Sequence, residues 1–146
     1  MKRLLILLLV LTVAGVVFAQ RANEVGAPNA DRLGIDAAQQ YLREVSVEKF
    51  EKRLIATESR QLIDVRTPQE FETHRIPNAK NIDFRSPEFR QQIEQLDKTK
   101  PVLIYCRAGV RSKAAMEIFR EAGFQTVYEL DGGIQAWIYS GKSVSP

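Results

Sequence analysis

Short apolar runs alternate with amphipathic segments along most of the chain beyond residue 40. The runs at 61–65, 101–105 and 126–130 contain β-branched residues and are bounded by turn-forming or charged residues, which is typical of buried strands. A further strand is predicted at 79–84. Between these runs, apolar residues recur at three- and four-residue spacing, which indicates helices. The helices are expected near 47–55, 69–73, 88–96, 112–122 and 134–139.

Capping and breaking residues mark the ends of several predicted helices. Ser46 can cap the first helix, and Thr67-Pro68 ends the strand at 61–65. Ser86-Pro87 predicts a helix with proline at its first position, and Gly123 suits the position just after the helix at 112–122. The residues expected to face the core from two of these helices are Val47, Phe50, Leu54, Ile55, Ala115, Ile118 and Phe119.

This alternation of strands and helices predicts an α/β fold, with a central parallel sheet flanked by helices on both faces. Parallel sheets of this kind carry their chemistry at the carboxyl ends of the strands. Asp64 and Cys106 are the two charged or nucleophilic residues that fall at such ends.

The first 19 residues have the pattern of an export signal. Lys2 and Arg3 precede an apolar run from 4 to 18, and Val17-Phe18-Ala19 places small residues before a cleavage site between Ala19 and Gln20. The alternative is an uncleaved N-terminal membrane anchor, although the run is shorter than the roughly 17 to 25 residues of a usual span. We therefore expect a periplasmic or secreted protein.

Removal of this signal changes the charge balance. The mature chain keeps 19 basic residues against 18 acidic ones, because Lys2 and Arg3 leave with the signal. Such a balance gives no reason to expect nucleic acid or an anionic membrane as a partner.

Cysteine usage is more informative than charge. The chain has one cysteine and one histidine, so neither an internal disulfide nor a Cys/His metal site is expected, and no cofactor is expected. The free thiol of Cys106 is then an inert core group, an intermolecular bridge or a reactive group.

The residues after Cys106 favour the reactive group. A junction from strand to helix directs backbone N–H groups inward, and the helix N-terminus adds positive potential. Gly109 permits a tight curve, Ala108 keeps the rim small, and Arg107 and Arg111 add fixed cations. A cysteine in this field is expected to favour its nucleophilic thiolate form. The candidate substrate-binding residues are Arg107, Ala108, Gly109, Val110 and Arg111.

The ordered motifs of this chain resemble those of single-domain rhodaneses. These motifs are LIDVRTPQEF at 62–71, IP at 76–77, VLIYCRAGVRS at 102–112 and DGGIQAW at 131–137. The resemblance implies a rhodanese-like three-layer domain at 45–141. It leaves 20–44 as a linker and N-terminal extension, and 142–146 as a C-terminal tail.

The resemblance also implies a reaction. Cys106 is similar to the catalytic cysteine of the family, and 106–111 to its six-residue active-site loop. Cys106 would take sulfane sulfur from thiosulfate or a similar donor and hold it as a persulfide. The sulfur would then pass to a thiol or cyanide. The implied partners are a small anionic sulfur donor and a thiol or dithiol acceptor protein. A non-enzymatic binding or persulfide-carrier module is the alternative.

The length of the loop argues against a third function. Cysteine-dependent phosphatases and arsenate reductases place arginine after five intervening residues, in a cradle sized for tetrahedral phosphate. Here the arginine arrives one position earlier, at Arg111, and Ser112 occupies the phosphatase position. The smaller loop disfavours phosphoryl chemistry.

The remaining candidates carry weaker expectations. Asp64 is expected to be structural, as a strand-end carboxylate that positions the neighbouring loop, and Trp137 to be a core or rim aromatic. Arg66 and Glu70 are expected to pair at the surface, where such pairs contribute little.

The segment at 74–79 departs from the family pattern. Many members have Gly-His-Ile-Pro-Gly-Ala where this chain has HRIPNA. His74 is therefore interpreted as a solvated histidine and Arg75 as a solvated cation. Asn78 is expected to adopt the left-handed conformation that glycine would favour.

Overall fold

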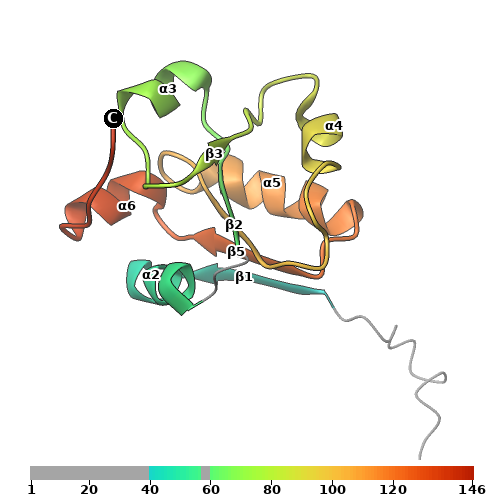
Figure 1. Ribbon diagram of the computed structural model, residues 1–146, viewed down its shortest axis with the longest axis horizontal. Coiled ribbons are helices and arrows are strands. Elements are labelled where there is room, and N and C mark those ends of the chain that lie inside the picture. Colours follow the sequence, from blue (N-terminus) through green and yellow to red (C-terminus); the bar gives the residue numbers. More distant parts are fainter. Residues whose placement is uncertain (1–39, 57–59) are drawn as a thin grey trace, which may run out of the picture. The chain divides into compact units, whose positions relative to one another are not determined.

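The computed structural model describes residues 40–56 and 60–146 (Figure 1). One five-stranded parallel sheet, with strand order β1-β5-β4-β2-β3, forms its centre. The strands are β1 (Tyr41–Val45), β2 (Gln61–Asp64), β3 (Lys80–Asn81), β4 (Val102–Tyr105) and β5 (Thr126–Leu130). The helices are α2 (Val47–Ala56), α3 (Pro68–Thr73), α4 (Phe89–Ile93), α5 (Val110–Glu121) and α6 (Gly133–Tyr139).

Helices cover both faces of the sheet, which confirms the three-layer α/β fold. Figure 1 shows α5 above β5 and β1, whereas α2 lies lower than β5, at about the height of β1. Phe119 of α5 and Phe89 of α4 belong to one buried cluster, and Phe50 of α2 and Trp137 of α6 to the other. Side chains alternate between the two faces along each strand, so β4 contributes to both clusters and all four of its residues are buried.

The folded unit extends beyond both predicted boundaries. Residues 41–44, assigned to the linker from the sequence, form the edge strand β1 together with Val45, and this strand pairs with β5 along its whole length. Three of its five residues are exposed polar or aromatic side chains, so the strand lacks the continuous apolar run of a central strand. At the other end, Ser145 forms an antiparallel bridge with Arg75. The predicted tail therefore packs on the domain.

Some element boundaries differ from the sequence prediction. The strand expected at 79–84 is only Lys80–Asn81, and the helix expected at 88–96 is the single short helix Phe89–Ile93. Glu88 N–H donates to Ser86 Oγ, so a turn occupies the residues before this helix and Pro87 lies outside it. Ile55 was wrongly placed in the core; its side chain is 77% exposed.

Two turn predictions are confirmed. Gly123 has a positive φ of 85° just after α5, where Phe124 N–H donates to the Phe119 carbonyl and closes the helix end. Asn78 has a φ of 65°, the left-handed conformation expected in place of a glycine.

The predicted export signal, its cleavage site and the linker up to residue 39 lie outside the described residues. In the part of the chain that is described, no helix combines the length and apolar character needed to cross a membrane.

Candidate active site

The loop that follows β4 holds Cys106 at the carboxyl edge of the sheet. Cys106 is 1% exposed and follows a strand whose every residue is buried. Gly109 adopts a φ of 94° and caps α5 without a side-chain hydrogen bond. This conformation favours glycine and lets the chain turn directly from strand to helix. The helix begins at Val110, two residues earlier than predicted, so the candidate loop includes its first turn.

Hydrogen-bond donors converge on the Cys106 sulfur. Gly109 N–H donates to Sγ at 3.2 Å, and Ser112 Oγ lies 3.3 Å from it. Burial raises the pKa of the Cys106 thiol, but the hydrogen bonds from Ser112 and from the backbone N–H groups of Ala108 and Gly109 outweigh it, so the pKa lies below its usual value. The loop thus favours a thiolate inside the fold.

The start of α6 is hydrogen-bonded to the backbone of the same loop. Ile134 N–H donates to the Cys106 carbonyl at 2.9 Å, and Gln135 N–H to the Arg107 carbonyl at 3.1 Å. The approach requires glycine at Gly133, where a Cβ atom would lie 2.5 Å from the Cys106 carbonyl oxygen. The Gly-Gly pair after β5 therefore fixes the backbone of the nucleophile.

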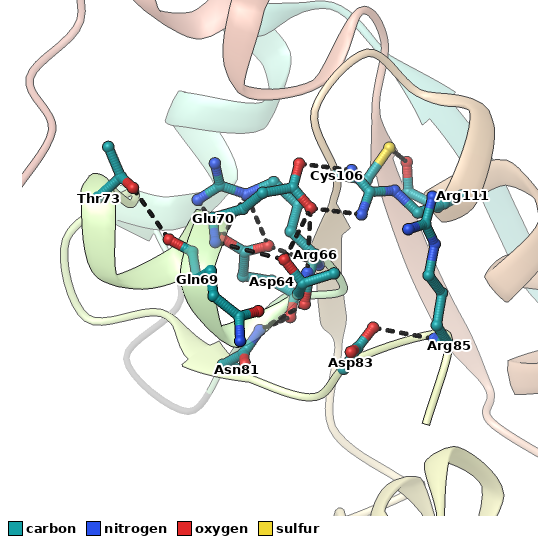
Figure 2. A network of polar contacts seen from close by, with 12 residues as sticks. Asp64, Arg66, Gln69, Glu70, Thr73, Asn81, Asp83, Arg85, Cys106 and Arg111 are labelled. Atoms are coloured by element: carbon teal, nitrogen blue, oxygen red, sulfur yellow. Dashed lines mark hydrogen bonds and ion pairs between the residues drawn. The ribbon is translucent and has the colours of Figure 1, made fainter. Parts of the chain in front are cut away.

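Arg111 is held by an acidic residue from a different helix. Its guanidinium binds Glu70 of α3 through two hydrogen bonds of 2.6 and 2.8 Å (Figure 2). Arg111 holds the pKa of Glu70 at about 2, well below its usual range. Glu70 also forms a capping box with Thr67 at the start of α3. Part of the Arg111 charge is therefore already neutralised.

The prediction that Arg66 and Glu70 form an ion pair at the surface is wrong. Arg66 is 2% exposed and instead binds Asp64, with Nε 3.0 Å from each carboxylate oxygen and Nη2 2.7 Å from Oδ2 (Figure 2). Arg66 Nη2 also donates to the His74 carbonyl at 2.6 Å. Asp64 therefore organises the segment that follows its own strand, through a buried ion pair.

A cleft of about 350 Å³ adjoins the loop on the side of α3 and α6. Arg107 is exposed and lines this cleft, as does His74, which is partly buried rather than a fully solvated histidine. The lining consists of Arg66, Glu70, Thr73, His74, Arg107, Ile134, Gln135 and Ile138. Cationic and apolar groups thus lie together beside the loop that carries Cys106.

The structure also places four other candidate residues. Ala108 and Val110 are exposed on the rim of the loop. Trp137 is 5% exposed in the core, as predicted, and its Nε1–H donates to the Ser143 carbonyl. Arg75 is partly buried and lies 4.7 Å above the Phe71 ring, so it is not the solvated cation that was expected.

Ser112 and Glu129 were not identified from the sequence as parts of the site. Both are fully buried, and Ser112 Oγ lies 2.6 Å from Glu129 Oε1. One signal was available for Glu129: strand alternation places it on the same face as Val127, which belongs to the core. In the described part of the chain, no group of three or more His, Cys, Asp or Glu side chains is arranged to hold a metal ion.

Comparison with known proteins assigns the chain to a family. The Rhodanese-like domain family matches residues 46–140, and the chain belongs to this family. A protein named sulfurtransferase from Allochromatium vinosum is 35% identical over 103 residues, which cover 70% of this chain and 94% of the relative. The thiosulfate sulfurtransferase GlpE of Vibrio cholerae is 37% identical over 76 residues, covering 52% of this chain and 70% of the relative.

A solved structure agrees with this assignment. The crystal structure of a rhodanese-related protein from Thermoplasma volcanium matches with a TM-score of 0.62 and 29% identity, covering 70% of this chain and 97% of that chain. Together with the sulfurtransferase relatives, the family supports rhodanese-type sulfur transfer as the general activity.

Proposed function

We propose that the protein is an exported sulfurtransferase that moves sulfane sulfur from thiosulfate or a similar donor to a thiol or cyanide acceptor. The hydrogen bonds that converge on Cys106 Sγ carry this proposal, because they stabilise the thiolate that the reaction requires. The GlpE relative named as a thiosulfate sulfurtransferase supports the choice of donor.

The reaction proceeds in two displacement steps at one sulfur atom. The Cys106 thiolate attacks the outer sulfur of thiosulfate, the S–S bond breaks, and sulfite leaves with the bonding electrons. The resulting persulfide anion carries the transferred sulfur. An acceptor thiolate or cyanide then attacks that sulfur, and Cys106 leaves again as a thiolate. The Gly109 N–H group donates to Cys106 Sγ and stabilises the Cys106 thiolate before the first step and after the second.

Arg107 is the better placed cation for the donor. The Arg111 guanidinium is bound by both oxygens of Glu70, whereas Arg107 is exposed and lines the adjoining cleft. A guanidinium binds a sulfonate as it binds a carboxylate or phosphate, through paired N–H groups. The sulfonate end of thiosulfate is therefore assigned to Arg107.

An intact-mass experiment tests the proposal. After incubation with thiosulfate, the protein is expected to gain the mass of one sulfur atom, and added cyanide is expected to remove it as thiocyanate. The Cys106→Ala variant should show neither change. No adduct on the native protein, or an adduct that persists in Cys106→Ala, contradicts the proposal. An adduct without repeated turnover indicates instead the carrier module that the sequence left as an alternative.

The same measurement addresses export. Cleavage after Ala19 would leave Gln20 as the first residue, so the protein recovered from the periplasm or medium should have the mass of 20–146. Full-length protein that remains with the membrane would contradict this part of the proposal and support the anchor.

A further inference from the structure

The buried carboxyl of Glu129 lies at the end of a chain of polar groups that begins at the candidate nucleophile. Ser112 Oγ is 3.3 Å from Cys106 Sγ and 2.6 Å from Glu129 Oε1. All three side chains are at most 1% exposed. Three elements bring them together: the loop after β4, the first turn of α5, and β5.

The Ser112 hydroxyl has more acceptors than protons. Its single hydrogen faces Cys106 Sγ, Glu129 Oε1 and the Gly109 carbonyl oxygen, which lies 3.1 Å away. When Glu129 is a carboxylate, the charged oxygen at 2.6 Å is the strongest of these acceptors. When Glu129 is protonated, it can donate to Ser112 Oγ, and the Ser112 hydrogen is then available to the sulfur.

Glu129 lacks the partners that usually stabilise a buried carboxylate. Oε2 has no hydrogen-bond partner among the described residues. Burial raises the pKa of Glu129 to about 7. The charged groups that face it are Lys113 of α5, Glu44 of β1 and Asp131 after β5, and β4 places the apolar Ile104 opposite it. Lys113 is shared with both acids, at 2.7 Å from Glu44 and 3.6 Å from Asp131.

We propose that Glu129 is a positioning residue of the Cys106 site, which directs the Ser112 hydroxyl to the sulfur when it holds a proton and withdraws it when ionised. A proton can pass along the chain without a co-reactant. The Cys106 S–H proton moves to Ser112 Oγ while the Ser112 proton moves to Glu129 Oε1, giving a thiolate and a neutral carboxylic acid. Charge repulsion disfavours the state in which both ends are anions.

This inference deepens the proposed sulfur transfer, and it is tested without a sulfur donor. The chain has a single cysteine, so ultraviolet thiolate absorbance reports Cys106 alone once the Cys106→Ser curve is subtracted. Because the assay needs no donor, failure of sulfur transfer and failure of the inference are separate outcomes.

The thiolate titration should change in midpoint and shape when Glu129 is replaced by glutamine. The Glu129→Gln amide keeps the shape, remains neutral and can donate to Ser112 Oγ. We expect its thiolate midpoint to fall by about one pH unit, a roughly tenfold gain in thiolate at pH values below the midpoint. The wild-type curve should be broader than a one-proton titration, and the Glu129→Gln curve should follow one proton.

Two further variants separate the relay from general electrostatics. Glu44→Gln removes an exposed acid that lies opposite Glu129 in the sheet register. It should shift the thiolate midpoint far less than Glu129→Gln does. In a Ser112→Ala background, Glu129→Gln should lose most of its effect, because the hydroxyl that connects the two ends is absent. An unchanged or raised midpoint in Glu129→Gln overturns the inference, as does an equal shift in Glu44→Gln.

Discussion

Among the described residues, two buried carboxyl groups lie in contrasting surroundings. Asp64, at the end of β2, is bound by the Nε and Nη2 atoms of Arg66 and by the Arg66 backbone N–H. Glu129, near the end of β5, has the Ser112 hydroxyl on one oxygen and no partner on the other among the described residues. Both side chains are fully buried. Asp64 is thus bound by a cation through several N–H donors, whereas Glu129 has a single neutral donor and is the underpartnered acid of the two.

The difference separates an acid that holds the fold together from an acid whose burial favours its neutral form. A buried charge is tolerated when a cation and hydrogen bonds replace its water, as they do for Asp64. A buried carboxyl without them favours its neutral form, as Glu129 does. The fold thus uses the paired acid to hold the segment after β2, while the underpartnered acid contacts the hydroxyl beside the nucleophile.

The largest expected effect comes from breaking the paired acid. Arg66→Met removes the cation and leaves Asp64 buried and charged, so the free energy of unfolding should fall by about 3 to 5 kcal/mol. Urea unfolding at neutral pH measures this change. The double variant Asp64→Asn/Arg66→Met should recover part of the loss, because no isolated charge remains.

An exposed arginine provides the matched control for Arg66. Arg90 pairs with Glu121 at the surface, where its side chain is 61% exposed. Arg90→Met should change the free energy of unfolding by less than about 1 kcal/mol. A loss in Arg66→Met no greater than that in Arg90→Met would show that burial does not distinguish the two ion pairs.

The second prediction concerns the underpartnered acid and the pH dependence of stability. The pKa of Glu129 is raised to about 7 in the folded protein, from a usual value of 4.5. Its contribution to stability is therefore present below about pH 4.5 and is lost as the pH rises through 7. When the pH rises from about 5 to about 8, ionisation of Glu129 should lower the free energy of unfolding of the wild type by about 2 kcal/mol. The Glu129→Gln variant should not show this loss.

Urea unfolding of both proteins at the two pH values measures that difference, and Glu44→Gln serves as the control. Glu44 lies opposite Glu129 in the sheet register but is exposed, so its replacement should lower the pH midpoint of the stability loss only slightly and keep the loss itself. Parallel pH profiles for the wild type and Glu129→Gln would contradict the prediction.

The contrast between the two acids also explains what the sequence could predict. Asp64 and Cys106 were identifiable because each follows a short apolar run, and strand ends in a parallel sheet share one edge. Glu129 lies inside such a run, between Tyr128 and Leu130, where alternation gives its face but not its neighbours. Which residues meet across the sheet depends on strand order, and the sequence pattern does not contain that order.

The same limit applies to the arginines and to β1. Arg66 and Glu70 are four residues apart, a spacing that favours a local pair, but each binds a different partner: Arg66 binds Asp64, and Glu70 binds Arg111, which is 41 residues away. Strand β1 escaped prediction because its pairing with β5, not its own apolar content, makes it a strand.

The smallest expected effect is a change in the pKa of Glu129 that comes from a charge on the surface. Lys113 lowers the pKa of Glu129 through its charge, and it also binds Glu44 and Asp131, both of which raise that pKa. Lys113→Met removes the favourable cation and leaves two acids less neutralised, so both changes should raise the pKa of Glu129. The shift should be less than about one pH unit, because the side chain is half exposed and its charge is screened by solvent and salt.

The pH midpoint of the stability loss should therefore move upward in Lys113→Met, and added salt should reduce the displacement. Lys98→Met is the matched control, since Lys98 pairs with Glu94 at a surface site and does not act on Glu129. A downward shift in Lys113→Met would mean that Glu129 responds to something other than the charges around it. An unchanged midpoint would leave burial as the sole cause of its raised pKa. The expected upward shift would show that the acid beside Ser112 is adjusted by surface charges that do not contact Cys106.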